Sequence, residues 1–534
     1  MSAHGITTCF GIPGVHNLGF WDADGPGRPR VIGVRHEQAA GYAADALHRT
    51  TGGLAAALLT SGPAAANVVT AFGEAYTARS PFLAIASDMN TALLHPDGRR
   101  GILHEMNDQA AMFAAFGAFA RTAGSADDAI RDVNEALRVT LTPPHAPAYV
   151  GVPSNLIPAE WNGALPEPLP LKRPIVDQLA IDDLAALIAR SPRVVLWLGG
   201  GVVESNTEAD VRRLAHHLGA VVVTSFAARG VMAGDGHLAD VPVHEPEVAA
   251  LVESADLLVV LGSDMDAMNT RNWKMPLPPA TAIITLGDEA ARTFDWSLMV
   301  NADLRDAIPM LEAELMERGV GARDLWAPAG ALRAEVFSRL RADARVASAI
   351  AFVTAIEQAW PQQSAIVSDM SICGYWTALY AHHARPRRSH YPVGWGTLGY
   401  ALPAAIGPAS QGISTLAVCG DGGPMFALGE LATYVQESLP ITLLVVDDGG
   451  YGMLRFDQQA FGHPERGVDL VTPDWVMLAS SFGISGVEVG TVSALPGALR
   501  EAHVANSRGE PRLIVWKQAL YPPRTSSPRW FEEP

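Results

Sequence analysis

Short, almost unbroken runs of apolar residues recur along the chain and alternate with longer stretches of helical periodicity. Strands are expected at residues 54–61, 82–87, 193–199, 220–225, 256–262, 415–420 and 441–446. A strand that is apolar on both sides suits a parallel sheet with helices on both of its faces. The pattern therefore predicts an α/β protein of doubly wound parallel sheets.

Two interruptions divide this alternation into three blocks. Residues 163–177 contain four prolines and predict an extended linker. Residues 318–345 are polar and helical, and they predict a second connection before a helix at 346–360. A chain of 534 residues also suits several domains. The expected domains are N-terminal over 1–162, central over 178–320 and C-terminal over 346–534.

The net charge, the apolar runs and the cysteines indicate which partners and which compartment to expect for this protein. A formal net charge of −18 argues against a nucleic-acid partner and an anionic membrane, although it does not forbid one local anion site. No apolar run approaches ~18 residues and the first residues lack a secretory pattern, so neither a membrane span nor a leader is expected. Cys9, Cys373 and Cys419 are far apart and odd in number, which favours a reducing cytoplasm over a disulfide framework.

The strongest chemical signal lies at the ends of two successive predicted strands. Gly420, Asp421 and Gly422 follow one apolar run, and Asp448 follows the next. The carboxyl ends of parallel strands form the ligand-binding edge of an open α/β sheet. Two carboxylates there can bind a hard cation such as Mg²⁺, and backbone N–H groups of the glycine turn can bind phosphate. The residues indicate a metal-bridged diphosphate; the alternative is two ordinary Gly/Asp turns.

These residues resemble the cofactor signature of the thiamine diphosphate enzymes. The signature is GDG, here followed by 24 residues, a doublet and a glycine, and Asp447 and Asp448 stand where the family usually has two asparagines. Three further segments resemble the family in the same order, at 35–53, 60–76 and 394–407. Spaced motifs in the right order are more specific than any one of them.

The nearest groups that the chain resembles are acetolactate synthase-like enzymes and related 2-oxo acid decarboxylases. Residues 10–17 and 103–109 are more similar to decarboxylases of guanidino-2-oxo acids. The resemblance implies a pyrimidine-binding, a central and a diphosphate-binding domain. It also implies that a small 2-oxo acid loses CO₂, after which the acyl carbanion is protonated or added to a second carbonyl. The active sites would lie between the subunits of a homodimer or homotetramer.

The resemblance assigns roles to residues around the cofactor. Glu37 matches the glutamate that relays a proton to the aminopyrimidine ring. Leu398 matches the bulky residue that holds the cofactor bent, and the carbonyl of Gly396 would accept a bond from the aminopyrimidine. The implied Mg²⁺ ligands are the side chains of Asp421 and Asp448 and the carbonyl of Gly450.

Further residues of these segments are candidates. His16, His104 and Gln109 lie in polar loops that face the substrate in relatives, so they are catalytic candidates; a structural role is the alternative for each loop histidine. The segment after the strand near residue 367 should approach the diphosphate. The remaining residues expected to bind the cofactor are Ser371, Gly420, Gly422, Gly423 and Tyr451.

Two other interpretations come from different classes of protein. A nucleotide-dependent oxidoreductase would use the glycines of 197–205, but Glu204 stands where the dinucleotide fingerprint needs its third glycine. A non-catalytic, regulatory paralogue would have lost the glutamate or the aspartates of the signature. Glu37, Asp421 and Asp448 are all present, which favours an enzyme.

Several properties stay open at this stage, among them the identity of the 2-oxo acid, the fate of the carbanion and the acceptor. FAD, which acetolactate synthases bind in the central domain, is not expected, because residues 262–269 replace the usual Arg-Phe-Asp phrase. Relatives also carry a helix before the strand that contains Phe10. That helix is expected to be shortened here or to lie upstream of Met1.

Overall fold

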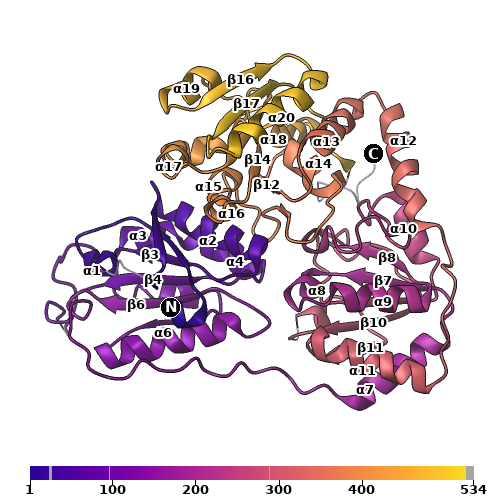
Figure 1. Ribbon diagram of the computed structural model, residues 1–534, viewed down its shortest axis with the longest axis horizontal. Helices are drawn as coiled ribbons and strands as arrows, with labels where there is room; N and C mark the ends of the chain where they lie inside the picture. The colour runs from indigo at the N-terminus through magenta and orange to yellow at the C-terminus, as the bar shows by residue number, and fades with distance from the viewer. Residues whose placement is uncertain (23–26, 96, 288, 525–534) are drawn as a thin grey trace.

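Three parallel sheets organise the part of the chain that this computed structural model describes, residues 1–22, 27–95, 97–287 and 289–524 (Figure 1). In each sheet the strand order reverses its direction, so the connecting helices cover both faces. The predicted fold class, three doubly wound parallel sheets, is confirmed.

The N-terminal sheet has the strand order β2-β1-β3-β4-β6-β5. Its strands are β1 (Thr8–Gly11), β2 (Arg30–Gly33), β3 (Ala56–Leu59), β4 (Leu83–Asp88), β5 (Ala120–Thr122) and β6 (Ala148–Pro153). The helices of this domain are α1 (Leu18–Trp21), α2 (Glu37–Thr51), α3 (Pro63–Asn67), α4 (Val69–Thr77), α5 (Ala111–Ala114) and α6 (Ala126–Leu141), with a 3₁₀ turn, η1 (Ser2–His4), before β1. The apolar runs 54–61 and 82–87 contain β3 and β4, as predicted.

The central sheet has the order β11-β10-β9-β7-β8. Its strands are β7 (Val194–Leu198), β8 (Val221–Thr224), β9 (Leu257–Leu261), β10 (Ala280–Thr285) and β11 (Leu298–Asn301). The helices are α7 (Gln178–Ala189), α8 (Gly200–Glu204), α9 (Glu208–Leu218), α10 (Pro246–Glu253) and α11 (Leu304–Glu317). Short 3₁₀ turns lie at η2 (Phe226–Ala228) and η3 (Ala290–Arg292).

The C-terminal sheet has the order β13-β12-β14-β15-β17-β16. Its strands are β12 (Ala365–Ser368), β13 (Ser389–His390), β14 (Thr415–Gly420), β15 (Ile441–Asp447), β16 (Ser485–Val489) and β17 (Arg512–Lys517). Its helices are α13 (Ala347–Ala359), α14 (Ile372–Tyr380), α15 (Ala401–Ala404), α16 (Ile406–Ser410), α17 (Glu430–Gln436), α18 (Gly452–Ala460), α19 (Trp475–Ser481) and α20 (Leu495–Asn506). The 3₁₀ turns are η5 (Pro424–Phe426) and η6 (Val492–Ala494).

The two predicted connections have different structures. Residues 163–177 contain no helix or strand, are almost entirely exposed, and run along the lower edge of the molecule to α7 (Figure 1). The second connection contains a 3₁₀ turn, η4 (Ala329–Ala331), and helix α12 (Leu332–Ala342) before α13. A proline-rich segment stays extended because proline fixes φ at about −65° and lacks the N–H that a helix or a sheet would use.

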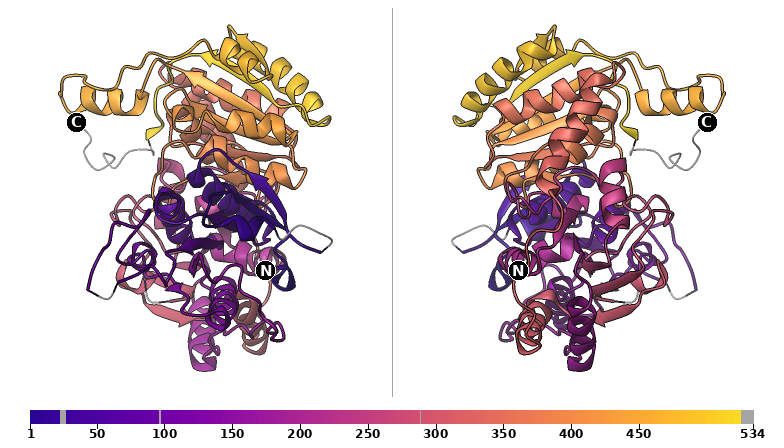
Figure 2. Two further views of the ribbon diagram at one scale, coloured as in Figure 1. Left: turned by 90° about the vertical axis from the view of Figure 1, so that its left-hand side faces the viewer. Right: turned by 90° about the vertical axis from the view of Figure 1, so that its right-hand side faces the viewer.

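The C-terminal domain rests on the other two domains (Figures 1 and 2). Helix α2 packs against α15 and α16, and side chains of both domains form one buried cluster. A Cβ on Gly407 would lie 2.2 Å from the carbonyl oxygen of Ala43, so the helices approach at backbone distance. Below this contact, Arg49 bonds the buried carboxylates of Asp45 and Glu74 at 2.8 and 3.2 Å. The interface between the N-terminal and C-terminal domains is therefore mainly apolar, and the buried charges in it are paired with each other.

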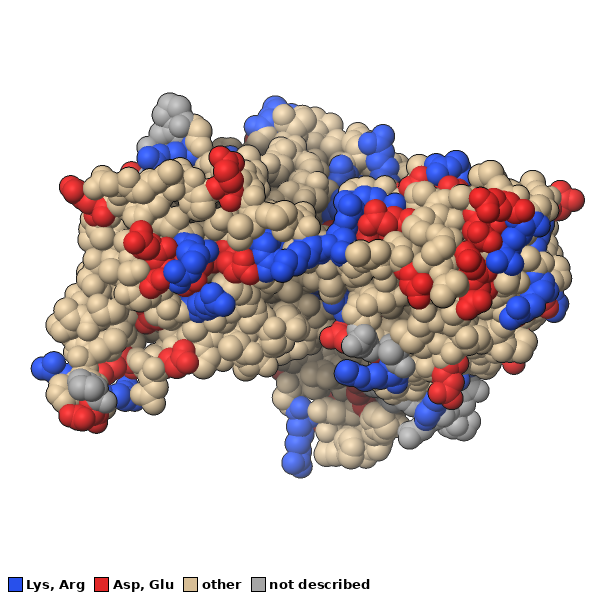
Figure 3. Space-filling model, turned by 90° about the horizontal axis from the view of Figure 1, so that it is seen from below, with Lys and Arg blue, Asp and Glu red and all other residues tan. Residues whose placement is uncertain are grey.

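Charged side chains of both signs are distributed over the surface of the molecule (Figure 3). On the face seen in Figure 3, basic and acidic side chains are interspersed, and the described residues there form no broad basic patch. None of the described helices is long and apolar enough to span a membrane. Cys9, Cys373 and Cys419 are buried and form no disulfide.

Candidate active site

The carboxyl ends of three neighbouring strands, β12, β14 and β15, form a glycine-lined edge of the C-terminal sheet. A Cβ on Gly422 would lie 2.6 Å from Cε1 of Tyr451, and one on Gly423 would lie 2.6 Å from Oδ2 of Asp369. A Cβ on Gly450, whose φ is 155°, would lie 1.9 Å from a carbonyl oxygen. Only glycine fits these positions, and such an edge can present backbone N–H groups to an anion.

Two carboxylates meet at this edge without enough hydrogen-bond donors. Oδ1 of the buried Asp421 accepts a bond from the backbone N–H of Asp448 at 3.4 Å. Oδ2 of Asp421 and Oδ1 of Asp448 have no hydrogen-bond partner among the described residues. Burial, and next the charge of Asp448, raise the pKa of Asp421 to about 7, and burial also raises the pKa of Asp448. A hard cation satisfies such a pair of buried acceptors.

The turn that carries Asp448 is held by two residues that sequence analysis gave no separate role. Asp447 is buried, and its carboxylate accepts bonds from the N–H of Gly449 and the indole of Trp475, each at 3.1 Å. Arg455 donates to the carbonyls of Asp448 and Gly449 at 3.4 and 3.2 Å. Asp447 therefore shapes the turn, and Asp448 is the member of the doublet whose Oδ1 has no hydrogen bond among the described residues, with Nη1 of Arg455 4.0 Å away.

Asp369 joins the end of β12 to the segment that contains Gly396 and Leu398. Its Oδ1 accepts bonds from the N–H groups of Gly399 and Tyr400 at 3.0 and 3.3 Å. A Cβ on Gly399 would lie 3.1 Å from a carbonyl of the glycine turn after β14. Gly396 has a φ of 69°, and the Leu398 side chain is 36% exposed. The segment that resembles the pyrimidine support therefore lies against the turn that resembles the diphosphate site.

Ser371 lies at the same edge but bonds within its own helix start. Its Oγ accepts a bond from the N–H of Gly374 at 3.2 Å, as the N-cap of α14, and lies 3.2 Å from Sγ of Cys373. A Cβ on Gly420 would be in ordinary contact with Ser371, at 3.4 Å. The hydroxyl of Ser371 thus has a local structural partner beside the glycine turn.

Glu37 is the first residue of α2, just beyond the end of β2 in the N-terminal sheet. Its Oε2 accepts a bond from the side-chain amide of Asn67 at 2.9 Å, and the residue is half-buried. His36 is the N-cap of the helix, and its Nδ1 accepts a bond from the N–H of Gln38 at 3.2 Å. Among the described residues, no hydrogen bond or ion pair joins Glu37 to Asp421.

Ser61 brings two catalytic candidates together. Its buried hydroxyl lies 3.0 Å from Nδ1 of His16 and 3.1 Å from Nδ1 of His104, and the two rings pack edge to face with centroids 5.2 Å apart. Burial, and next His16, lower the pKa of His104. Gln109 is buried, and its Oε1 accepts a bond from the N–H of Gly62 at 2.6 Å. Gln109 thus anchors the loop that presents the histidine pair.

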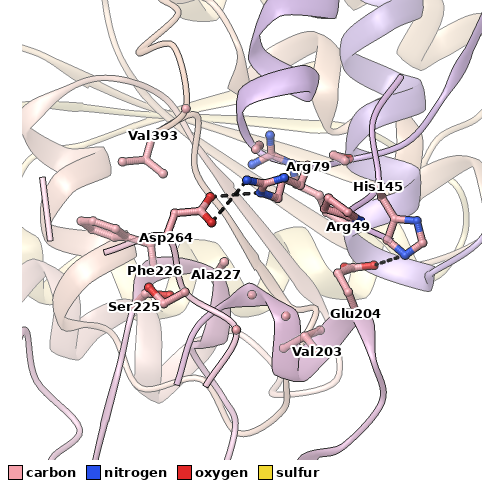
Figure 4. A pocket seen from close by; sticks show the side chains of 18 of the residues that line it. Arg49, Arg79, His145, Val203, Glu204, Ser225, Phe226, Ala227, Asp264 and Val393 are labelled. Atoms are coloured by element: carbon pink, nitrogen blue, oxygen red, sulfur yellow. Dashed lines mark hydrogen bonds and ion pairs between the residues drawn. The ribbon is translucent and has the colours of Figure 1, made fainter. Parts of the chain in front are cut away.

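A cavity of about 440 Å³ lies where the three domains meet. It lies at the carboxyl ends of the strands of the central sheet. Figure 4 shows Arg79 paired with Asp264 on its wall. Glu204 bonds His48 at 3.0 Å and Arg387 at 3.1 Å. Burial alone would raise the pKa of Glu204, but the ion pairs with His48 and Arg387 hold it at about 2. Glu204, which stands where a dinucleotide-binding fingerprint would have its third glycine, therefore connects α8 to the N-terminal domain through His48 and to the C-terminal domain through Arg387.

Three family models match the chain. They are described as the N-terminal TPP binding domain, the central domain and the C-terminal TPP binding domain of thiamine pyrophosphate enzymes. They match residues 1–112, 181–311 and 369–515 respectively. The glycine-lined edge with its two carboxylates falls within the third of these matches.

Curated relatives extend the likeness over most of the chain. A probable 2-ketoarginine decarboxylase, AruI, of Pseudomonas aeruginosa is 32% identical over 90% of this chain and 87% of its own length. An acetolactate synthase of Mycobacterium bovis is 28% identical over 94% of the chain and 84% of its own length. The large subunit of acetolactate synthase isozyme 2 of Escherichia coli is 26% identical over 100% and 98%. The chain therefore belongs to the thiamine pyrophosphate enzymes, in the family of acetolactate synthase-like enzymes and 2-oxo acid decarboxylases.

Proposed function

We propose that the chain binds thiamine diphosphate through Mg²⁺ at the edge formed by β12, β14 and β15 and decarboxylates a 2-oxo acid. The observation that carries the proposal is the pair of carboxylates, Asp421 and Asp448, each with a buried oxygen that accepts no hydrogen bond from the described residues, beside glycines that leave no room for side chains. When bound, thiamine diphosphate supplies the nucleophilic carbon and the electron sink that decarboxylation requires.

The residues of the edge would divide the binding between them. Asp421, Asp448 and the carbonyl of Gly450 bind the metal ion, because hard cations take oxygen ligands and Mg²⁺ shares them with phosphate. The backbone of Gly420, Gly422 and Gly423, with Ser371 and Tyr451, lines the diphosphate. Gly396 and Leu398 orient the rings from the segment that Asp369 anchors.

The N-terminal domain would supply the groups that move protons. Glu37 would hold the aminopyrimidine by a hydrogen bond, and its carboxyl would supply and take back the proton. His16 and His104, which share the Ser61 hydroxyl, bind the substrate carboxylate or hold a proton for the product. Gln109 supports this pair through the loop it anchors.

The relatives favour one substrate class for the first test. The P. aeruginosa relative, named as a probable 2-ketoarginine decarboxylase, is 32% identical, whereas the two acetolactate synthases are 28% and 26% identical. Segments 10–17 and 103–109, which carry His16 and His104, point the same way. We therefore propose a guanidino-2-oxo acid before pyruvate.

Product analysis tests the proposed function directly. The protein loaded with thiamine diphosphate and Mg²⁺ is given pyruvate, a longer aliphatic 2-oxo acid or 2-ketoarginine, each alone and with an aldehyde acceptor. CO₂ release with an aldehyde product indicates protonation of the carbanion, and a hydroxyketone indicates carboligation. No cofactor-dependent CO₂ release from any of these acids would refute the proposal.

We propose that the cavity where the three domains meet does not bind FAD. Asp264, in the segment that replaces the usual phrase, bonds Arg79 at 3.0 and 3.3 Å on the cavity wall. Glu204 and its partners occupy another part of the wall.

We propose a cytoplasmic location, since the three buried thiols are unpaired and suit a reducing compartment.

The active site is proposed to form between two copies of the chain. Large apolar side chains are exposed next to the predicted cofactor residues, as a contact surface requires. They are Trp395 (51% exposed), Leu398 (36%), Met425 (44%), Phe426 (53%) and Leu454 (49%). Glu37 and Asp421 would then come from different subunits at each site, in a homodimer or homotetramer.

Mixed dimers test this arrangement. Glu37→Gln and Asp421→Ala subunits are each expected to be inactive alone. After co-refolding, a mixed dimer has one site with both native residues, so a random mixture should recover about one quarter of native activity. Sites built within single chains would show no recovery, and active monomers in analytical ultracentrifugation would also contradict the arrangement.

Mg²⁺ affinity should rise with pH as the Asp421 carboxyl loses its proton. Its pKa of about 7 in the metal-free protein means that a proton competes with the ion below neutrality. Because this pKa is raised, the stability that Asp421 contributes without metal is present at acid pH and is lost as pH rises through about 7. Calorimetry should find Mg²⁺ binding about tenfold weaker one pH unit below that value than one unit above it. Equal affinities would contradict the assignment.

A further inference from the structure

Glu430 is a buried carboxylate of the C-terminal domain with partners in the N-terminal domain. It is the first residue of α17 and is 1% exposed. Its Oε1 accepts bonds from two successive backbone N–H groups, those of Arg35 at 2.8 Å and His36 at 3.0 Å. Its Oε2 accepts a bond from the hydroxyl of Thr433 at 2.7 Å. Both oxygens are therefore used, and two of the three donors lie across the domain boundary.

The two peptide groups bound by Glu430 directly precede Glu37. Residues 34–36 connect β2 to α2, and His36 is the extended N-cap, with φ −145° and ψ 140°. Because both N–H groups point at one carboxylate oxygen, the chain is held in position at the residue before the helix starts. The place and direction of the Glu37 side chain depend on that backbone.

Neighbouring contacts show that this joint is tight. A Cβ on Gly429 would lie 3.3 Å from Cβ of Arg35, so the loop before α17 approaches the segment at backbone distance. The guanidinium of Arg35 donates to the side chain of Gln436 at 2.6 Å, at the other end of α17. Beyond it, Arg30 bonds Glu437 at 2.6 Å. Helix α17 therefore contacts residues 30–36 along its length.

We propose that Glu430 is a positioning residue that sets the backbone before Glu37 and so aims the Glu37 carboxylate at the cofactor. The inference rests on the proposed role of Glu37. It adds that the domain carrying the glycine turn and Asp421 also fixes the start of α2 in the same chain. Removing the carboxylate takes the acceptor away from two part-buried N–H groups, and the segment shifts to recover bonds. Displacements of about 1 Å near a reacting group can cost roughly 100-fold in rate.

Three variants separate positioning from stability. Glu430→Ala removes the acceptor. Glu430→Asp keeps the charge but retracts the carboxylate by one methylene, which gives a second test where the alanine variant folds poorly. Glu430→Gln keeps an oxygen toward Arg35 and His36, with its NH₂ toward the Thr433 hydroxyl, and should rescue. Glu437→Gln is the matched control, because it removes the charge of the ion pair with Arg30 in the same joint, and Glu437 bonds neither Arg35 nor His36.

The first readout needs no cofactor. In hydrogen–deuterium exchange of the metal-free protein, the amides of Arg35 and His36 should lose protection in Glu430→Ala and Glu430→Asp and keep it in Glu430→Gln and Glu437→Gln. The second readout is exchange of the proton on the thiazolium carbon in the loaded enzyme. It should slow roughly 10- to 100-fold in the alanine and aspartate variants, with thiamine diphosphate affinity unchanged.

A double variant completes the test. If Glu430 acts through Glu37, Glu37→Gln/Glu430→Ala should exchange the thiazolium proton no more slowly than Glu37→Gln alone. Native exchange in Glu430→Asp, or additive losses in the double variant, would overturn the positioning role and leave the proposed function standing. Native exchange in Glu37→Gln itself would overturn both the role of Glu37 and this inference, so the two failures are distinguishable.

Discussion

Replacing Asp421 by alanine should abolish Mg²⁺-dependent binding of thiamine diphosphate and leave the fold intact. Asp421 is buried at the end of β14, with Oδ2 unpartnered among the described residues and its pKa raised to about 7 by burial and by Asp448. Loss of a second-sphere group typically costs about 10- to 100-fold in metal affinity, so loss of a ligand should cost at least about 100-fold. Calorimetry of thiamine diphosphate with and without Mg²⁺ measures the effect.

The metal-free Asp421→Ala protein should melt at the native temperature or slightly above it. A buried carboxyl whose Oδ2 lacks a donor, and whose Oδ1 accepts a long bond of 3.4 Å, adds little stability to the fold, so its removal relieves a desolvation cost. Asp264→Ala is the matched control, since Asp264 follows β9 of the central sheet and bonds Arg79 instead. Unchanged cofactor affinity in the Asp421 variant would disprove the metal assignment.

Replacing Glu37 by glutamine should leave cofactor affinity nearly native and remove most turnover. Glutamine keeps the size of the side chain and can still bond Asn67, but it cannot exchange a proton with the aminopyrimidine. A positioned acid contributes about 10²- to 10⁴-fold, so a loss of that order is expected in kcat. Exchange of the thiazolium proton should slow in parallel, and the loss should be similar for every 2-oxo acid.

Glu208→Gln is the control for the Glu37 variant. Glu208 is also the first residue of a helix, α9, but in the central domain. It should keep native turnover, which separates proton exchange from the general effect of a charge at a helix start. Native turnover in Glu37→Gln would make Glu37 a structural residue.

Many strands were predictable because burial on both faces requires an unbroken apolar run. All the expected runs coincide with strands, among them β9 (Leu257–Leu261) and β15 (Ile441–Asp447). Some buried inner strands, such as β6 (Ala148–Pro153) and β17 (Arg512–Lys517), lie outside these runs. So do the sheet edges β2 (Arg30–Gly33), β5 (Ala120–Thr122) and β16 (Ser485–Val489), which are partly exposed. An edge strand has one neighbour and little apolar surface, so its local sequence resembles a loop.

The family and its reaction class were also readable from the sequence, and the comparisons confirm them. The signature around Asp421 and Asp448 is local: glycines are required where backbone approaches backbone, and acids where a cation is bound. Such requirements are met within a few residues and therefore leave a pattern in one segment of chain.

The tertiary structure decided how similar residues divide their tasks. The resemblance assigned the metal to Asp448 and gave no separate role to Asp447; in the structure Asp447 bonds the indole of Trp475, whereas Oδ1 of Asp448 has no hydrogen bond among the described residues and lies 4.0 Å from Arg455. Glu204 was visible only as a missing glycine, although it bonds partners from both other domains. Glu430 gave no signal at all, because its partners in the N-terminal domain, Arg35 and His36, lie about 395 positions away in the chain. The sequence alone therefore predicts a site whose residues lie within one short segment. The partner of a buried charged side chain is decided by how the domains pack, which one segment of sequence does not show.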